Sequence, residues 1–194
     1  MIDRCKYMDE SEVKQLRKSI MAWNDADLYK GRLQGPLTWL LVDMALGTGL
    51  RVSELAALKV QDIDFKRKAL KVIRLKKKKK TIETLGIGDD LVKHLESYLE
   101  GRQDGYLFMG KRGQLHKAGL QVIWKQAIKR AGLPKELSIH SARHTMGFTL
   151  LKKTKNLRQV QKQLGHSSPA ITANIYADVS FDEMRDGVNG LYEP

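Results

Sequence analysis

Five side chains of this sequence could together transfer a nucleic-acid phosphodiester without a metal ion. Tyr176 stands ten positions after His166, and upstream of them lie Arg51, His140 and Arg143. Breaking a phosphodiester requires a nucleophile, cations that hold the charge of the pentacoordinate transition state, and an acid for the leaving oxygen. A tyrosine can be that nucleophile, because attack by its phenolate leaves a phosphotyrosine ester that stores the bond energy for rejoining.

The arginines and histidines carry this hypothesis, because the chain has six tyrosines and composition cannot choose among them. The motif that surrounds His166 is what selects Tyr176. His140 and Arg143 are three positions apart, so they share one face of the segment if it is helical. The permanent charge and planar fork of an arginine suit two phosphate oxygens.

Arg51 directly follows a Thr-Gly-Leu turn at the end of a strongly apolar segment. Such a turn is a good place for a fixed side chain to leave the core. An arginine there also commonly forms a surface ion pair, for which Glu54 is the candidate. The position alone does not decide between these roles.

Five consecutive lysines, Lys76 to Lys80, separate two segments in which apolar and polar residues alternate. The alternation predicts a hairpin that presents amines at its tip. One amine could reach a scissile phosphate while the others bind neighbouring phosphates electrostatically. The same run is also typical of a solvated stretch or of a nuclear-localisation patch.

The elements that must position these residues are mainly helical. Apolar spacing and Gly or Pro breaks predict a single domain with a small antiparallel sheet. We expect helices over residues 9–23, 37–47, 52–58, 89–99, 117–131, 140–153, 157–164 and 169–176, strands over 63–65, 69–75 and 81–87, a loop over 31–35, and a small helix or tail over 181–190.

Composition narrows the partners and the cofactors. A length of 194 residues suits one domain, and a formal net charge of +13 favours a polyanion. An anionic membrane is the least supported of the possible polyanionic partners, because no apolar run approaches the roughly 18 residues of a membrane span. The sequence has no Gly-rich loop with a Gly-Lys pair for a nucleotide and no Cys/His spacing for zinc. Asp62 and Asp64 have no clear partners for a two-metal site. The single cysteine, Cys5, cannot form an internal disulfide.

Three segments together resemble the catalytic domain of the tyrosine recombinases, also called the phage integrase family. Thr48–Leu55 resembles the first arginine box of the family, His140–Thr145 the second box, and Leu164–Ser168 the approach to the nucleophile. The resemblance is best over residues 7–179. It implies the catalytic-domain fold over residues 1–180, a C-terminal helix or tail over 181–194, and no N-terminal core-binding domain in this chain.

The resemblance also implies catalytic roles, with neither metal nor cofactor. Arg51 and Arg143 would clamp the scissile phosphate, and Tyr176 would attack phosphorus to give a 3′-phosphotyrosine and a free 5′-hydroxyl. His140 would accept or relay the tyrosine proton, and His166 would hydrogen-bond the phosphate.

Supporting roles follow from the same resemblance. Lys76 would protonate the leaving oxygen, although the hairpin lacks the glycine common in the family and the assignment could move by one or two positions. Glu54 would orient Arg51. Lys77, Lys78, Lys79 and Lys80 would bind DNA.

The implied function is that of a site-specific DNA recombinase, most simply an integrase of a phage or other mobile element. The implied partner is double-stranded DNA, bound by a monomer that assembles as a tetramer on paired sites, in the bacterial cytoplasm and on the nucleoid. Two alternatives stay open. One is DNA relaxation of the type IB topoisomerase kind, and the other is a DNA-binding module that regulates recombination without cutting.

Overall fold

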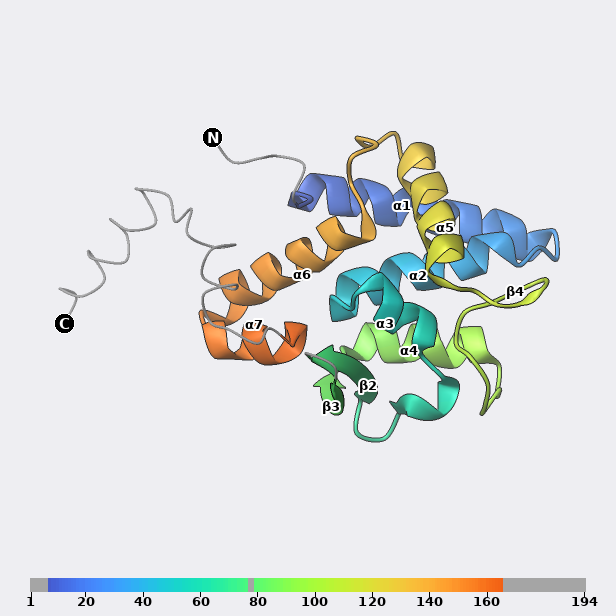
Figure 1. Cartoon of the computed structure of the whole chain (residues 1–194). Helices are drawn as coiled ribbons and strands as arrows, with labels where there is room; N and C mark the ends of the chain where they lie inside the picture. The colour runs from blue at the N-terminus through green and yellow to red at the C-terminus, as the bar shows by residue number, and fades with distance from the viewer. Residues whose placement is uncertain (1–6, 77–78, 166–194) are drawn as a thin grey trace.

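The computed structural model describes residues 7–76 and 79–165. This part of the chain is mainly helical, with a three-stranded antiparallel sheet in the order β1-β2-β3 and a short β4-β5 pair. These features confirm the predicted fold class. The elements in Figure 1 are α1 (Glu10–Tyr29), α2 (Gln34–Thr48), α3 (Val52–Ala57), the 3₁₀ turn η1 (Val60–Asp62), β1 (Ile63–Asp64), β2 (Ala69–Lys76), β3 (Lys79–Gly86), α4 (Asp89–Leu99), β4 (Met109–Gly110), β5 (Gly113–Gln114), α5 (Lys117–Arg130), α6 (Ile139–Thr154) and α7 (Leu157–Leu164).

Helix α2 lies at the centre of the described domain, with α1, α4, α5 and α6 packed against it (Figure 1). Most of its side chains are buried, Leu40, Leu41 and Met44 completely. A helix that is apolar on all sides is typical of a core. It ends at Gly49, whose φ of 65° lies in the left-handed region that glycine adopts without strain. This turn directs the chain straight into Arg51.

Helix α1 runs further than its apolar spacing predicts, to Tyr29 instead of residue 23. Its start is fixed by a capping box, in which Asp9 and Glu12 each accept the other's backbone N–H. No glycine or proline interrupts it before Gly31. Its last turn is tied to α2, because the buried Asp27 carboxylate accepts the backbone N–H of Gly35 at 2.9 Å. The predicted loop over 31–35 is partly wrong, because α2 already begins at Gln34.

The hairpin of β2 and β3 is paired from Ala69 opposite Gly86 to Lys76 opposite Lys79. Burial alternates along β2 as in a half-buried strand, with Val72 and Arg74 buried and Ile73 exposed. β3 begins two residues before its predicted start. The lysine run therefore continues both strands and does not form only a loop.

Helices α6 and α7 match their predicted ranges to within one residue. Ser138 caps α6 and Asn156 caps α7, each by accepting backbone N–H groups of the first turn. The two-residue strands β4 and β5 were not predicted, because they are too short to show an alternation. Among residues 7–76 and 79–165, none of the helices has the length and apolarity that a membrane-spanning segment requires.

Candidate functional site

Arg51 stands at the start of α3 in extended conformation, two residues after the turn at Gly49. Glu54 holds it twice: one carboxylate oxygen accepts the Arg51 backbone N–H at 2.8 Å, and the other pairs with the guanidinium at 2.9 Å. The Glu54 side chain is 6% exposed and that of Arg51 is 43% exposed. Arg51 is thus oriented by a buried carboxylate while its guanidinium still reaches the surface.

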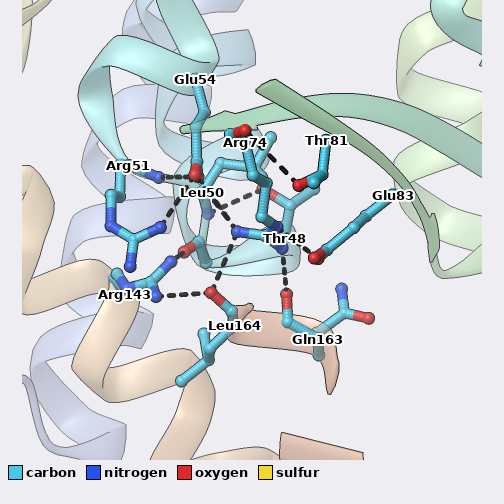
Figure 2. A network of polar contacts seen from close by, with 11 residues as sticks. Thr48, Leu50, Arg51, Glu54, Arg74, Thr81, Glu83, Arg143, Gln163 and Leu164 are labelled. Atoms are coloured by element: carbon cyan, nitrogen blue, oxygen red, sulfur yellow. Dashed lines mark hydrogen bonds and ion pairs between the residues drawn. The ribbon is translucent and has the colours of Figure 1, made fainter. Parts of the chain in front are cut away.

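Arg143 lies on α6 and is almost completely buried. Its guanidinium donates to the carbonyl oxygen of Gly49 at 2.7 Å and to that of Leu164 at 2.6 Å. It therefore joins the end of α2 to the end of α7. Figure 2 shows the guanidinium groups of Arg51 and Arg143 next to each other, below the turn that precedes α3.

His140 lies on α6, one turn before Arg143. Its ring meets the ring of His144 edge to face, with the centroids 4.4 Å apart. Partial burial lowers the pKa of His140 below its usual 6.5, and the charges of Arg143 and Arg51 lower that pKa further. The shift favours the neutral imidazole, the form that can accept a proton.

Arg74 is a site residue that the sequence reading missed. It lies on β2, is 1% exposed, and among residues 7–76 and 79–165 is one of the largest side chains to be fully buried. Its guanidinium contacts the Glu54 carboxylate at 3.2 and 3.3 Å, Glu83 at 2.7 Å, and the carbonyl oxygens at the end of α7 (Figure 2). One signal was available: an arginine at a position that should face inward in an apolar, alternating strand.

A pocket of about 390 Å³ opens beside Arg51 and His140. It lies between the start of α3, helix α5 and the segment that leads into α6. Three exposed lysines line it together with Arg51 and His140, and the sequence reading assigned none of them a role: Lys117, Lys125 and Lys135. Clustered amines of this kind bind phosphate oxygens as mobile point charges.

The remaining predicted site residues lie at the edges of the described ranges 7–76 and 79–165, or outside them. Lys76 is the last residue of β2, opposite Lys79 in the register. Lys80 pairs with Leu75 and is exposed. Lys77, Lys78, His166 and Tyr176 lie outside the described residues. Their roles, and those of Lys76 and Lys79, stay predictions.

The described site can hold an anion and accept a proton. Arg51 offers a partly exposed guanidinium, Arg143 a rigidly held one beside it, and His140 a neutral base. Fixed cations of this kind stabilise charge that develops on a phosphate, because they need no rearrangement as the reaction proceeds. Within residues 7–76 and 79–165, no three His, Cys, Asp or Glu side chains are grouped to hold a metal ion. Metal independence itself stays a prediction.

The described part of the chain is thus a mainly helical domain with a small antiparallel sheet, and it presents two guanidinium groups beside an imidazole. Comparison with known proteins identifies its family. Residues 6–183 match the model of the phage integrase family. The chain therefore belongs to the phage integrase family, which confirms the resemblance seen in its motifs.

Individual relatives agree with this membership. The chain is 35% identical over 157 residues to the tyrosine recombinase XerC of Oceanobacillus iheyensis, an alignment that covers 75% of this chain and 50% of that protein. Its fold is similar to the crystal structure of XerA recombinase, with a TM-score of 0.75 and 24% identity over 97% of this chain and 65% of that one.

A second solved structure is that of the XerH site-specific recombinase bound to difH substrate in a pre-cleavage complex. Its TM-score is 0.70, with 23% identity over 94% of this chain and 53% of that one. The chain spans about half the length of the curated relatives it matches.

Proposed function

We propose that this chain is the catalytic domain of a site-specific DNA recombinase that cuts and rejoins DNA through a 3′-phosphotyrosine intermediate. The observation that carries the proposal is that Arg51 and Arg143 lie side by side, with His140 near enough for both charges to lower its pKa. Membership of the phage integrase family supports it. Structural neighbours that were solved in complex with DNA support DNA as the partner.

In the proposed reaction, the Tyr176 oxygen attacks the scissile phosphorus and the bond to the 5′-oxygen breaks. The tyrosine proton passes to His140, whose lowered pKa keeps it ready to accept one. Lys76 donates a proton to the departing 5′-oxygen. Arg51 and Arg143 hold the non-bridging oxygens, and His166 adds a hydrogen bond to the phosphate. Attack by the 5′-hydroxyl of a second duplex reverses these steps and exchanges strands.

The hairpin lysines divide by their register positions. Lys76 is two positions beyond Arg74 on β2, so both belong to the same alternate set of strand positions. Lys76, the last residue of β2, stays the proposed general acid. Lys80 is exposed and belongs to the other set on β3, which suits a contact with a neighbouring phosphate. Lys77, Lys78 and Lys79 complete the proposed DNA-binding run.

The DNA backbone would continue from the scissile phosphate over the pocket beside Arg51. Lys117, Lys125 and Lys135 line this pocket and bring three positive charges to it. Phosphates that flank the cleavage point would meet these amines in sequence-independent contacts. The substrate class is accordingly duplex DNA, held mainly through its backbone.

For the assembly, we propose a monomer in solution and a tetramer on two paired DNA sites. Residues 181–194 would dock on a neighbouring protomer, because Phe181, Met184, Val188 and Leu191 form a modest apolar stripe in the sequence. We expect a chain that ends at Val179 to cleave DNA but to assemble less well on it, as measured by light scattering of the protein–DNA complexes. Equal assembly by the shortened chain would exclude the docking role.

Covalent trapping tests the proposed function directly. The chain, its Tyr176→Phe variant and a Tyr29→Phe control would be incubated with supercoiled plasmid in excess EDTA and quenched with SDS. Tyr29 is 92% exposed at the end of α1. Tyr29→Phe therefore removes the same chemical group at a place away from the site. We expect a protein–DNA adduct with the wild type and with Tyr29→Phe, and none with Tyr176→Phe.

Each other outcome rejects a definite part of the proposal. An adduct that persists in Tyr176→Phe means that another residue is the nucleophile. Relaxed plasmid without exchange between two duplexes favours the topoisomerase activity. DNA binding without any adduct favours a module that binds and does not cut.

A further inference from the structure

We propose that Arg74 is a positioning residue of the site, which sets the orientation of Arg51 through Glu54 and that of Arg143 through the end of α7. This inference rests on the proposed recombinase activity and adds to it a residue that acts through Glu54 and the end of α7. Arg74 contacts elements that are distant in sequence, because its partners come from α3, β3 and α7 (Figure 2).

The first link joins Arg74 to Arg51. The Glu54 carboxylate lies between the two guanidinium groups, 2.9 Å from Arg51 and 3.2 Å from Arg74. All three groups are close, but only Arg51 is substantially exposed. A carboxylate held from both sides cannot turn away from Arg51, so Arg74 fixes the rotamer in which Glu54 orients Arg51.

The second link is electrostatic. If Glu54 paired with Arg51 alone, the carboxylate would cancel most of the charge that Arg51 offers to a phosphate. Arg74 shares that carboxylate and is itself paired with Glu83 at 2.7 Å. Among the described residues, three guanidinium groups, with Arg143 included, face the two carboxylates of Glu54 and Glu83, which leaves this part of the cluster with a net positive charge. A positive cluster of low exposure binds an anion more strongly than the same charges in water.

The third link joins Arg74 to Arg143. Arg74 donates to the carbonyl oxygens of Gln163 at 2.7 Å and Leu164 at 2.9 Å. The Leu164 oxygen also accepts a bond from Arg143 at 2.6 Å. Carbonyl groups at the end of a helix lack intrahelical partners and carry partial negative charge, so two arginines stabilise this end of α7. One oxygen thus sets the place of both guanidinium groups.

The geometry requires an arginine. The planar fork of Arg74 bonds Glu54 and two carbonyl groups in different directions at once, which a lysine ammonium on a flexible stem cannot reproduce. Gly165 makes room for this fork, because a Cβ there would overlap the Arg74 guanidinium. Arg74→Lys keeps the charge and removes the fork, and it is the informative variant.

The test separates DNA binding from cleavage. Adduct formation on supercoiled plasmid in EDTA would be timed at saturating protein, and the Kd would be measured on a labelled duplex. We expect Arg74→Lys to slow adduct formation about 10-fold and Arg74→Met about 100-fold, in line with other residues that orient reacting groups. The Kd should change less than about threefold, because the surface lysines that dominate backbone binding are intact. Cleavage at the wild-type rate, or loss of binding and cleavage in equal measure, would overturn the proposal.

Arg17→Met is the matched control for a general loss of stability. Arg17 also pairs with a buried carboxylate, that of Asp43 at 2.8 Å, but it lies on α1 and is absent from the Arg74 network. We expect its adduct rate at saturation to equal that of the wild type. If Arg74→Met does not fold, as judged by circular dichroism, Arg74→Lys decides the question.

A double variant tests the route. If Arg74 acts through Glu54, then Arg74→Lys combined with Glu54→Gln should be little slower than the slower single variant. Effects that multiply would show that Arg74 acts independently of Glu54, against the proposal. The arginine Nε–H resonances of Arg51 and Arg143 provide a readout that needs no catalysis. Both should shift in Arg74→Lys, and unchanged resonances would refute the positioning role even if the wild type formed no adduct and the proposed function failed.

Discussion

Single residues in this site have properties set by their neighbours more than by their own chemistry. His140 is the clearest case. Partial burial and two adjacent guanidinium groups all disfavour its charged form, so its pKa is lowered below 6.5. An unperturbed histidine is partly protonated at pH 7, and the lowered pKa shifts His140 further toward its neutral form. The arginines that bind the phosphate thus also prepare the proposed base.

This shift predicts the pH dependence of cleavage. A lowered pKa means that the neutral form survives to lower pH, so the adduct rate at saturation should stay constant through pH 7 and fall only on acidification below 6.5. His140→Asn should be slower by about 100-fold or more and should lack this acidic limb. Single-turnover rates across the pH range check both points.

His116→Asn is the control for that measurement. His116 precedes α5, is exposed, and takes part in none of the contacts described above for Arg51, Arg74 and Arg143. Its variant should keep both the rate and the pH profile of the wild type. An acidic limb that persists unchanged in His140→Asn would assign the titration to another group.

At the scale of elements, the site depends on where helices end. The end of α2 supplies the Gly49 carbonyl and the turn before Arg51, and the end of α7 supplies the carbonyls of Gln163 and Leu164. Both helices finish with a glycine in the left-handed conformation. Arginines donate to the carbonyl groups at both helix ends. A change that destabilises either helix end should therefore also disturb the geometry of the site.

Two glycines allow this to be measured. Gly31 and Gly165 follow helices with nearly equal φ, 62° and 63°. Either change to alanine should cost about 1 kcal/mol of unfolding free energy for the left-handed conformation. A Cβ at Gly31 meets nothing within 4 Å, whereas one at Gly165 overlaps Arg74. Gly165→Ala should therefore cost about 1–3 kcal/mol more, because buried bonds to a charged group are lost.

Urea denaturation compares the two variants, and the adduct rate tests the consequence for the site. Gly165→Ala should slow cleavage at saturation, while Gly31→Ala should leave it unchanged. Equal losses of stability in the two variants would mean that Arg74 moves aside without cost.

The sequence predicted those parts of the site that are encoded locally. The spacing of His140 and Arg143 placed them on one helix, and the pair of Arg51 with Glu54 is three residues apart. Arg74 was not predictable in this way. Its partners Gln163 and Leu164 lie 89 and 90 residues further along the chain, and only the packing of α7 against β3 brings them together.

At the scale of the whole molecule, the positions of the positive charges should govern DNA binding more than their total does. The formal net charge is +13, yet only part of it adjoins the proposed DNA path. The pocket next to Arg51 gathers Lys117, Lys125 and Lys135, whereas exposed lysines on α1 and α4 lie elsewhere. Phosphate contacts release counterions, so each bound lysine contributes to the salt dependence of binding.

Changing Lys117, Lys125 and Lys135 together to glutamine should reduce the slope of log K against log salt concentration by about 2 to 3. The matched control removes the same three charges at Lys18, Lys30 and Lys93, which are exposed outside the pocket. Its slope should change by less than about 1. Titrations of a labelled duplex at several salt concentrations provide the slopes. Equal changes in both triple variants would mean that the total charge, and not this pocket, governs binding.

The contact between Arg74 and Gly165 also limits how such a sequence can diverge. A Cβ at position 165 would overlap the Arg74 guanidinium, so a side chain there requires Arg74 to shift. Arg74 that shifts in this way would lose its shared hold on Glu54 and α7. Replacement of Gly165 is therefore better tolerated where position 74 no longer carries an arginine. In an alignment of close relatives, we therefore expect these two columns to change together.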